Sequence, residues 1–116
     1  MTDQLSRIAT LNDRVRQGLD PAARIVITAA CAAALAEGSD PDATLRAHGE
    51  LLMAIDRCAF AADERDERRR GEVLFRGRAI RFAIDYYDRS LEWGSEDPGD
   101  PDVTTRVMTI MLPEDD

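Results

Sequence analysis

The sequence VLFRGRAIRFAIDYY, from Val73 to Tyr87, carries the clearest strand pattern in the chain. Its apolar residues recur at every second position, the period of a strand with one buried face. Val73 and Phe75 face one way before Arg76-Gly77, which can turn the chain. The second strand then divides its side chains between two faces, with Ile80, Phe82, Ile84 and Tyr86 on one and Ala79, Arg81, Ala83, Asp85 and Tyr87 on the other. The pattern predicts an antiparallel hairpin with its apolar face against helices.

After the hairpin the chain predicts a loop and a further strand. Residues 94–102 contain two Asp-Pro steps and must form a loop. Ser90 to Trp93 is predicted to add a short edge strand before it. Thr105 to Leu112 follows, apolar enough on both faces to lie inside the sheet.

Before the hairpin the period is helical. Residues 3–17 place Leu5, Ile8, Leu11 and Val15 on one stripe, with Thr2 or Asp3 as the N-cap. Ile25 to Thr28 is a short β-branched run that predicts a buried strand. Ala29 to Glu37 predicts a small-residue helix. Asp40-Pro41 opens a last helix that extends to about Arg57, and its expected inner face consists of Leu45, His48, Leu51, Leu52 and Ile55.

These elements predict a single α+β domain over residues 1–116, with helices packed on one face of a small, mostly antiparallel sheet. Residues 1–62 form the mainly helical half and residues 72–112 the mainly strand half. The charged run at residues 63–70 divides the two halves, as a solvated loop or the end of a helix. At 116 residues the chain is too short for two cores.

Composition narrows the class of protein. Hydrophobic residues at 44% and charged residues at 33% are typical of globular proteins. No apolar run approaches the roughly 20 residues of a membrane span, and the start lacks the pattern of a signal peptide. We therefore expect a cytoplasmic protein without membrane contact. Cys31 and Cys58 lie in alanine-rich contexts and are expected to be buried, reduced thiols.

The sequence offers little for catalysis. His48 is the one histidine, and zinc-binding, metalloprotease and phosphate-loop motifs do not occur. A lone histidine on a helix is more often structural than a general base. We therefore assign no catalytic residue, metal or cofactor. The alternative is a small metal-dependent hydrolase that uses carboxylates of the 85–102 segment, Asp85 and Asp88 among them.

The charge is divided unevenly. Residues 85–116 hold ten acidic and two basic residues, which accounts for the whole net charge of −8. The arginines of residues 65–81 are interleaved with acids, and the pI of about 4.6 argues against direct binding of nucleic acid. An acidic surface that carries aromatic residues favours a basic protein partner. The expected binding residues are Tyr86, Tyr87, Asp88, Trp93, Glu96, Asp97, Asp100 and Asp102.

The sequence from Ile84 to Leu112 resembles a bacterial family of unknown function (number 3768), and the resemblance lies in IDYYDRSL, WGSEDPGDP and TRVMTIML. The opening segment from Ile8 to Arg16 and the strand at Ile25 to Thr28 are similar to that family as well. Between that first strand and the segment that begins at Ile84, the family usually has an acidic loop with a histidine. Residues 61–73 of this chain keep the acidity and lack the histidine. The resemblance implies a compact α+β domain from bacteria or phage, often carried on mobile elements, and supplies no catalytic residue.

Together these observations favour a non-enzymatic acidic module that binds a basic protein. A phage- or plasmid-borne inhibitor of a host protein that handles nucleic acid, of the anti-defence or anti-CRISPR type, fits the size and charge. Two alternatives stay open: the small hydrolase, and a structural homodimer that pairs an exposed sheet edge.

Overall fold

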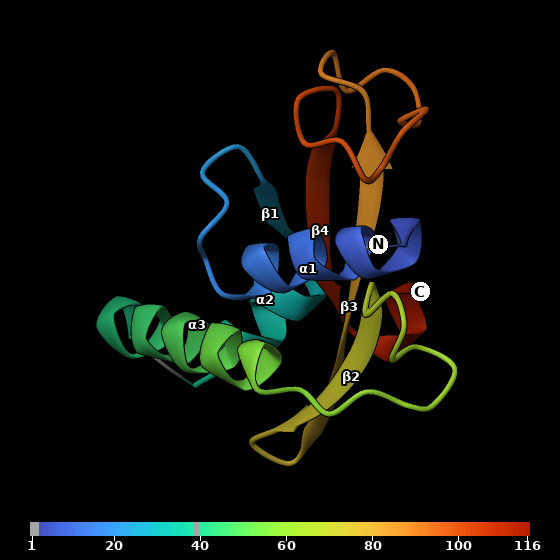
Figure 1. The fold of residues 1–116 in the computed structure, drawn as a ribbon. Coiled ribbons are helices and arrows are strands. Elements are labelled where there is room, and N and C mark those ends of the chain that lie inside the picture. Colours follow the sequence, from blue (N-terminus) through green and yellow to red (C-terminus); the bar gives the residue numbers. More distant parts are fainter. Residues whose placement is uncertain (1–2, 39) are drawn as a thin grey trace.

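The computed structural model describes residues 3–38 and 40–116, and Figure 1 shows helices packed against one sheet. The helices are α1 (Gln4–Arg16), α2 (Ala29–Ala36) and α3 (Pro41–Asp56), and a short 3₁₀ helix, η1 (Pro113–Asp115), follows the last strand. The strands are β1 (Arg24–Ile27), β2 (Arg70–Phe75), β3 (Arg78–Tyr87) and β4 (Thr105–Met111). The predicted α+β class is confirmed.

The four strands lie in the order β1-β4-β3-β2. β4 pairs antiparallel with β3, β3 pairs antiparallel with β2, and β1 pairs parallel with β4. The sheet is therefore mostly antiparallel, as predicted. β4 lies inside it, which agrees with its apolar residues on both faces.

The hairpin of β2 and β3 forms as the sequence predicts. Its two-residue turn places Arg76 at φ 53° and Gly77 at φ 80°, both in the left-handed region. Two such residues match the right-handed twist of the flanking strands, which is why short hairpins use this geometry. Phe75 therefore pairs with Arg78, and the register continues to Arg70 opposite Ala83.

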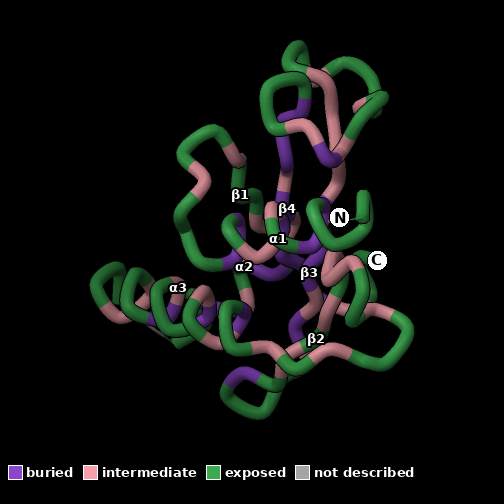
Figure 2. The backbone as a smooth tube through the Cα atoms, viewed as in Figure 1, coloured by how far each residue is buried: buried purple, intermediate pink, exposed green. Residues whose placement is uncertain are grey.

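The core lies between one face of the sheet and the three α-helices. Figure 2 shows buried segments along β3 and β4 and on the inner sides of the helices. The sheet contributes Phe75, Ile80, Phe82, Ile84, Met108, Ile110 and Leu112, and the helices contribute Val15, Cys31, Leu35, Leu51 and Ile55. Cys31 and Cys58 are both free thiols, and burial raises the pKa of each.

Side-chain caps begin the three α-helices. Asp3 accepts a hydrogen bond from the Ser6 backbone N–H, and Asp40 accepts one from Ala43. Thr2, the other predicted cap of α1, lies outside the described residues. Thr28, predicted as the end of a strand, instead caps α2 through the N–H of Cys31.

Two predictions of burial were wrong. β1 is an edge strand, so Ile25 and Val26 remain 45% and 46% exposed instead of buried. In α3 the buried residues are Ala47, Leu51 and Ile55, and Leu45 is 72% exposed. The three buried residues are spaced four apart and form one ridge of the helix, which packs toward the sheet. The small Ala47 permits close approach.

The predicted strand at Ser90–Trp93 was also wrong. These residues form turns and bends, and Leu91 has a φ of 64°, which does not fit a strand. A single bridge joins Tyr87 to Gly94. Residues 62–67 form turns and lead into β2 through Arg68 and Arg69, so the charged run is not the end of a helix. No α-helix in the described ranges is long and apolar enough to span a bilayer.

Candidate functional site

The acidic loop, residues 88–104, joins β3 to β4 and projects from one end of the sheet (Figure 1). Two Asp-Pro steps keep this segment out of regular structure. The turn of the β2–β3 hairpin lies at the opposite end of the molecule. The acidic loop and the hairpin turn therefore lie at opposite ends of the molecule.

A buried arginine of β4 is hydrogen-bonded to this loop. Arg106 is 2% exposed, and its Nη2 donates to the Pro98 carbonyl at 2.5 Å. Its Nε donates to the Asn12 Oδ1 at 2.9 Å, which ties the loop to α1. Burial lowers the pKa of the Arg106 guanidinium, and the two hydrogen bonds offset part of the cost of desolvating its charge.

Tyr86 belongs to the same buried network. Its hydroxyl donates to the Glu67 carboxylate and accepts from Asn12 Nδ2 at 2.9 Å. The guanidinium carbons of Arg69 and Arg106 lie over its ring, 5.1 and 4.9 Å from the centroid. Burial, followed by the bond to Glu67, raises the pKa of the Tyr86 hydroxyl, which stays protonated. The structure thus gives Tyr86 a supporting position beneath the predicted binding surface.

Three further contacts hold the loop, two inside it and one from α1. The hydroxyls of Ser95 and Thr104 lie 2.6 Å apart, and Thr104 also donates to the Asp97 carbonyl at 2.8 Å. Gln4 of α1 donates to Asp97 Oδ1 at 2.9 Å. These three bonds come from uncharged donors, and together with Arg106 they connect the loop across itself and to α1.

An open hollow of about 480 Å³ lies in the acidic loop. It is lined by Asp88, Trp93, Gly94, Glu96, Asp97, Asp100 and Val103. The Trp93 side chain is 72% exposed. The carboxylate of Asp88 accepts from the Ser90 hydroxyl at 2.6 Å, and this bond leads the contacts that lower the pKa of Asp88. The hollow combines an exposed indole with carboxylates.

The structure brings together five of the eight predicted binding residues, Asp88, Trp93, Glu96, Asp97 and Asp100. Tyr87 is half-buried at the end of β3, where it bridges to Gly94. Asp102 is exposed outside the hollow, and its carbonyl accepts a bond from Arg89 at 3.1 Å. Within the described residues no arginine forms an ion pair with a carboxylate of the acidic loop.

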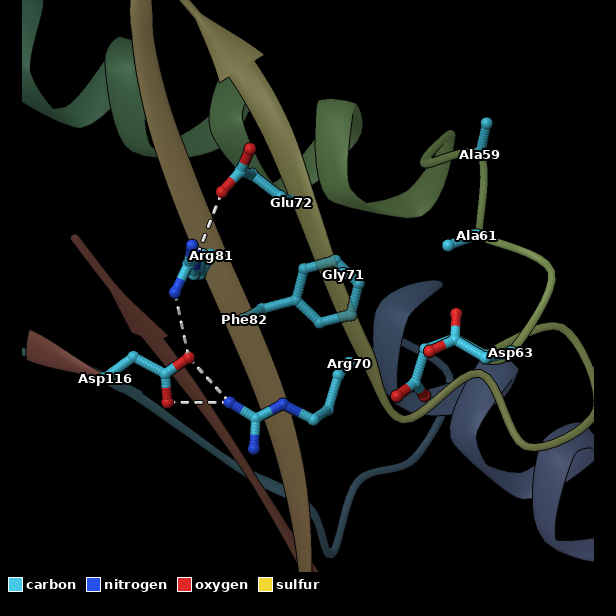
Figure 3. Close-up of a pocket in the computed structure, with 10 residues that line it drawn as sticks. Ala59, Ala61, Asp63, Arg70, Gly71, Glu72, Arg81, Phe82 and Asp116 are labelled. Atoms are coloured by element: carbon cyan, nitrogen blue, oxygen red, sulfur yellow. Dashed lines mark hydrogen bonds and ion pairs between the residues drawn. The ribbon is translucent and has the colours of Figure 1, made fainter. Parts of the chain in front are cut away.

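The acids at the end of the chain are arranged differently. Figure 3 shows Asp116 between two strand arginines, with Arg70 Nη2 at 2.6 and 2.7 Å from its two carboxylate oxygens and Arg81 Nη1 at 3.3 Å. Arg81 also pairs with Glu72 at 2.9 Å. In the same region Arg68 forms two bonds to Asp13, and Arg69 pairs with Asp85. Most arginines of residues 65–81 thus pair with acids of the same chain.

Outside the acidic loop, the described side chains that could bind a metal or act in catalysis do not cluster. Over residues 3–38 and 40–116, no group of three or more His, Cys, Asp or Glu side chains is arranged to hold a metal ion. His48 is half-buried on α3, and its Nε2 is buried without a hydrogen-bond partner in that part of the chain.

Sequence reasoning missed the network of Asn12, Glu67, Tyr86 and Arg106. One signal could have found it, since a tyrosine on the core face of a strand needs a partner for its hydroxyl. Asn12 also lies four residues after Ile8 and three before Val15, on the buried stripe of α1.

A family model described as a protein of unknown function (DUF3768) matches residues 43–115, which is more than half of the chain. The match begins in α3 and includes the whole acidic loop. No curated protein and no solved structure matches.

Proposed function

The chain belongs to the DUF3768 family, and we propose that it is a non-enzymatic acidic module that binds a basic protein. Trp93 and the carboxylates of Asp88, Glu96, Asp97 and Asp100 form the binding surface, with Asp102 at its rim. One observation carries the proposal: an exposed tryptophan lines a hollow with carboxylates that have no arginine partner in the described chain.

The chemistry of the hollow suits an arginine side chain of the partner. A guanidinium can stack on the indole face of Trp93 while it donates hydrogen bonds to carboxylates. Cation–π contacts with tryptophan are worth about 0.5–2 kcal/mol, and the surrounding negative field speeds encounter with a basic surface. Because the loop is already held by Arg106 and Thr104, little conformational entropy is lost on binding.

The partner class that we propose is a bacterial protein that handles nucleic acid. Such proteins carry basic surfaces that bind phosphates, and a fixed row of carboxylates can occupy the same surface. An inhibitor of a host defence nuclease, of the anti-CRISPR type and carried by a phage or plasmid, would use this mimicry.

The first test measures the affinity of the protein for a labelled oligoarginine peptide by fluorescence anisotropy, with an oligolysine peptide beside it. We expect Trp93→Ala to weaken oligoarginine binding about tenfold, near 1.4 kcal/mol, and oligolysine binding less. Leu74→Ala is the matched control, since Leu74 is 77% exposed on β2, away from the loop. Equal affinities of the Trp93→Ala variant and the wild type for oligoarginine would contradict the proposal.

The second test captures the partner from a bacterial lysate. The wild-type chain should retain a basic protein, and reversal of charge at Glu96, Asp97 and Asp100 to lysine should abolish its capture. Retention of nothing at low salt would contradict the proposal.

The hydrolase alternative makes a different prediction, tested by calorimetry with a divalent cation. Micromolar binding that is lost in Asp88→Asn would favour the hydrolase over the binding module.

A further inference from the structure

β1 is an open edge of the sheet. The sheet ends at β1 on one side, and β4 is its sheet neighbour. Both Ile25 and Val26 are nearly half exposed, although they are consecutive and point to opposite faces. An edge strand with exposed apolar residues is a template for pairing with another strand.

The backbone of β1 has hydrogen-bonding groups directed away from β4. The N–H of Thr28 donates to the Ile110 carbonyl at 3.0 Å, so Thr28 and Val26 direct their backbone groups toward β4. By alternation, Ile25 and Ile27 direct theirs outward. No backbone hydrogen bond joins Ile25 or Ile27 to a turn or loop of the described residues. These outward groups can bond a further strand.

Several side chains beside this edge are apolar. On the helix face, Ile25 lines a groove of about 230 Å³ together with Val15, Leu52 and Met53. Met53 is 54% exposed. On the other face, Val26 lies beside Thr109 of β4. A strand added at this edge would cover apolar surface on both faces of the sheet.

The charges near β1 favour one occupant. Arg24 forms no ion pair within the described residues. Four residues further on, Thr28 donates from its hydroxyl to Asp115 Oδ2 at 2.8 Å, which places a carboxylate at the other end of the strand. The edge therefore carries a positive charge at its start and a negative charge at its end.

We propose that β1 pairs antiparallel with β1 of a second copy of this chain, about a two-fold axis at Val26. In this register Ile25 of each copy forms a hydrogen-bonded pair with Ile27 of the other, and the two Val26 side chains meet. Arg24 of each copy then lies opposite Thr28 of the other, beside Asp115. The two-fold axis repeats this ion pair, so a second copy satisfies both charges at once.

The first test is sedimentation velocity of the whole chain over a range of concentrations. We expect a reversible dimer, and Val26→Lys should raise its Kd at least tenfold because two like charges would meet on the axis. Leu74→Lys, at an exposed position on the opposite edge strand, should leave the Kd unchanged. A wild-type chain that stays monomeric at the highest concentration, or a dimer that Val26→Lys does not weaken, overturns the proposal.

Charge reversal tests the register. Arg24→Asp and Asp115→Arg should each weaken the dimer, and the double variant should restore it. Asp115 also accepts from the Leu112 N–H at 3.1 Å, so the Asp115 variant can lose η1 by itself. A second measurement therefore avoids this residue.

That measurement is disulfide formation in Val26→Cys under mild oxidation. Residues that face each other in a non-hydrogen-bonded antiparallel pair have Cα atoms about 4.5 Å apart, which suits a disulfide. We expect rapid covalent dimers from Val26→Cys and slow ones from Leu74→Cys. Equal rates would overturn the register, as would a chain that is monomeric alone and pairs β1 only with an added peptide.

Discussion

The acidic loop (residues 88–104) and the C-terminal turn (residues 112–116) are both rich in carboxylates, but these carboxylates have different partners. At the C-terminal turn, Arg70 and Arg81 reach across the sheet to Asp116. In the acidic loop the carboxylates accept from uncharged donors such as Gln4 and Ser90, and the nearby Arg106 donates to the Pro98 carbonyl instead of a carboxylate.

Net charge along a sequence therefore does not separate acids that stabilise the fold from acids available to a partner. Strand register makes that separation. Arg81 and Met111 are paired across β3 and β4, and η1 then turns the chain so that Asp116 meets Arg81. No arginine in the described chain meets the acidic loop carboxylates in this way. The loop retains an uncompensated negative field, which is the basis of the proposed binding surface.

Arg106→Leu should change the molecule most, because it releases the acidic loop from its buried support. The substitution leaves the buried Asn12 Oδ1 and the Pro98 carbonyl without their donor. We expect unfolding free energy to fall by about 3 kcal/mol. Urea denaturation, followed by circular dichroism, measures this loss. The affinity of the variant for oligoarginine should fall as well, when it is measured without urea on folded protein. A stable variant with full affinity would show that Arg106 does not hold the loop.

A second variant removes the negative charge of the acidic loop and keeps the shape of its side chains. Glu96→Gln, Asp97→Asn and Asp100→Asn together preserve the acceptor oxygens that Gln4 and the Asp102 N–H use. We expect oligoarginine binding to weaken about tenfold at low salt and to depend less on salt. Stability should change by less than about 0.5 kcal/mol.

The matched control removes the same number of charges elsewhere. Asp63→Asn, Glu64→Gln and Asp66→Asn lie in the turns before β2, and none of the three forms an ion pair in the described structure. If the two triple variants weaken binding equally, total charge and not the acidic loop governs the affinity.

The smallest effect is expected from Asp116→Asn, and it should appear in stability alone. The hydrogen bond from Arg70 leads the causes that hold the pKa of Asp116 below its ordinary value of 3.8. The carboxylate therefore stabilises the fold fully above that value, and the contribution is lost as pH falls through the lower pKa of the folded state. Denaturation at neutral pH and near pH 3 should show a small difference between wild type and variant that shrinks in acid. Oligoarginine affinity should stay unchanged.

The sequence predicted most of the framework because its signals are local. Alternation from Val73 to Tyr86, the turn at Arg76-Gly77 and the caps at Asp3 and Asp40 each specify structure within a few residues. The burial of β1 could not be predicted this way, since Ile25 and Val26 are exposed because β1 has β4 on one side and, among the residues that the structure describes, no strand on the other. Period alone does not distinguish an edge strand from a central one.

The candidate site was predictable in part for the same reason. Acidity, Asp-Pro turns and Trp93 can be read within one segment. The support of that segment depends on Asn12 and Glu67, which lie far from Tyr86 and Arg106 in the chain and meet them only after the sheet has formed. The position of Tyr86 beneath the surface follows from those long-range contacts.

The parallel pairing of β1 with β4 also has a consequence for biosynthesis. β1 follows the first helix, whereas its neighbour in the sheet is made some eighty residues later. Contacts between segments so distant along the chain form slowly, because a large loop must close before they contribute. While the ribosome is still translating the acidic loop, α1, α2 and α3 have no completed sheet to cover. The nascent chain must therefore keep its apolar helix faces from aggregating until β4 emerges and the core can close.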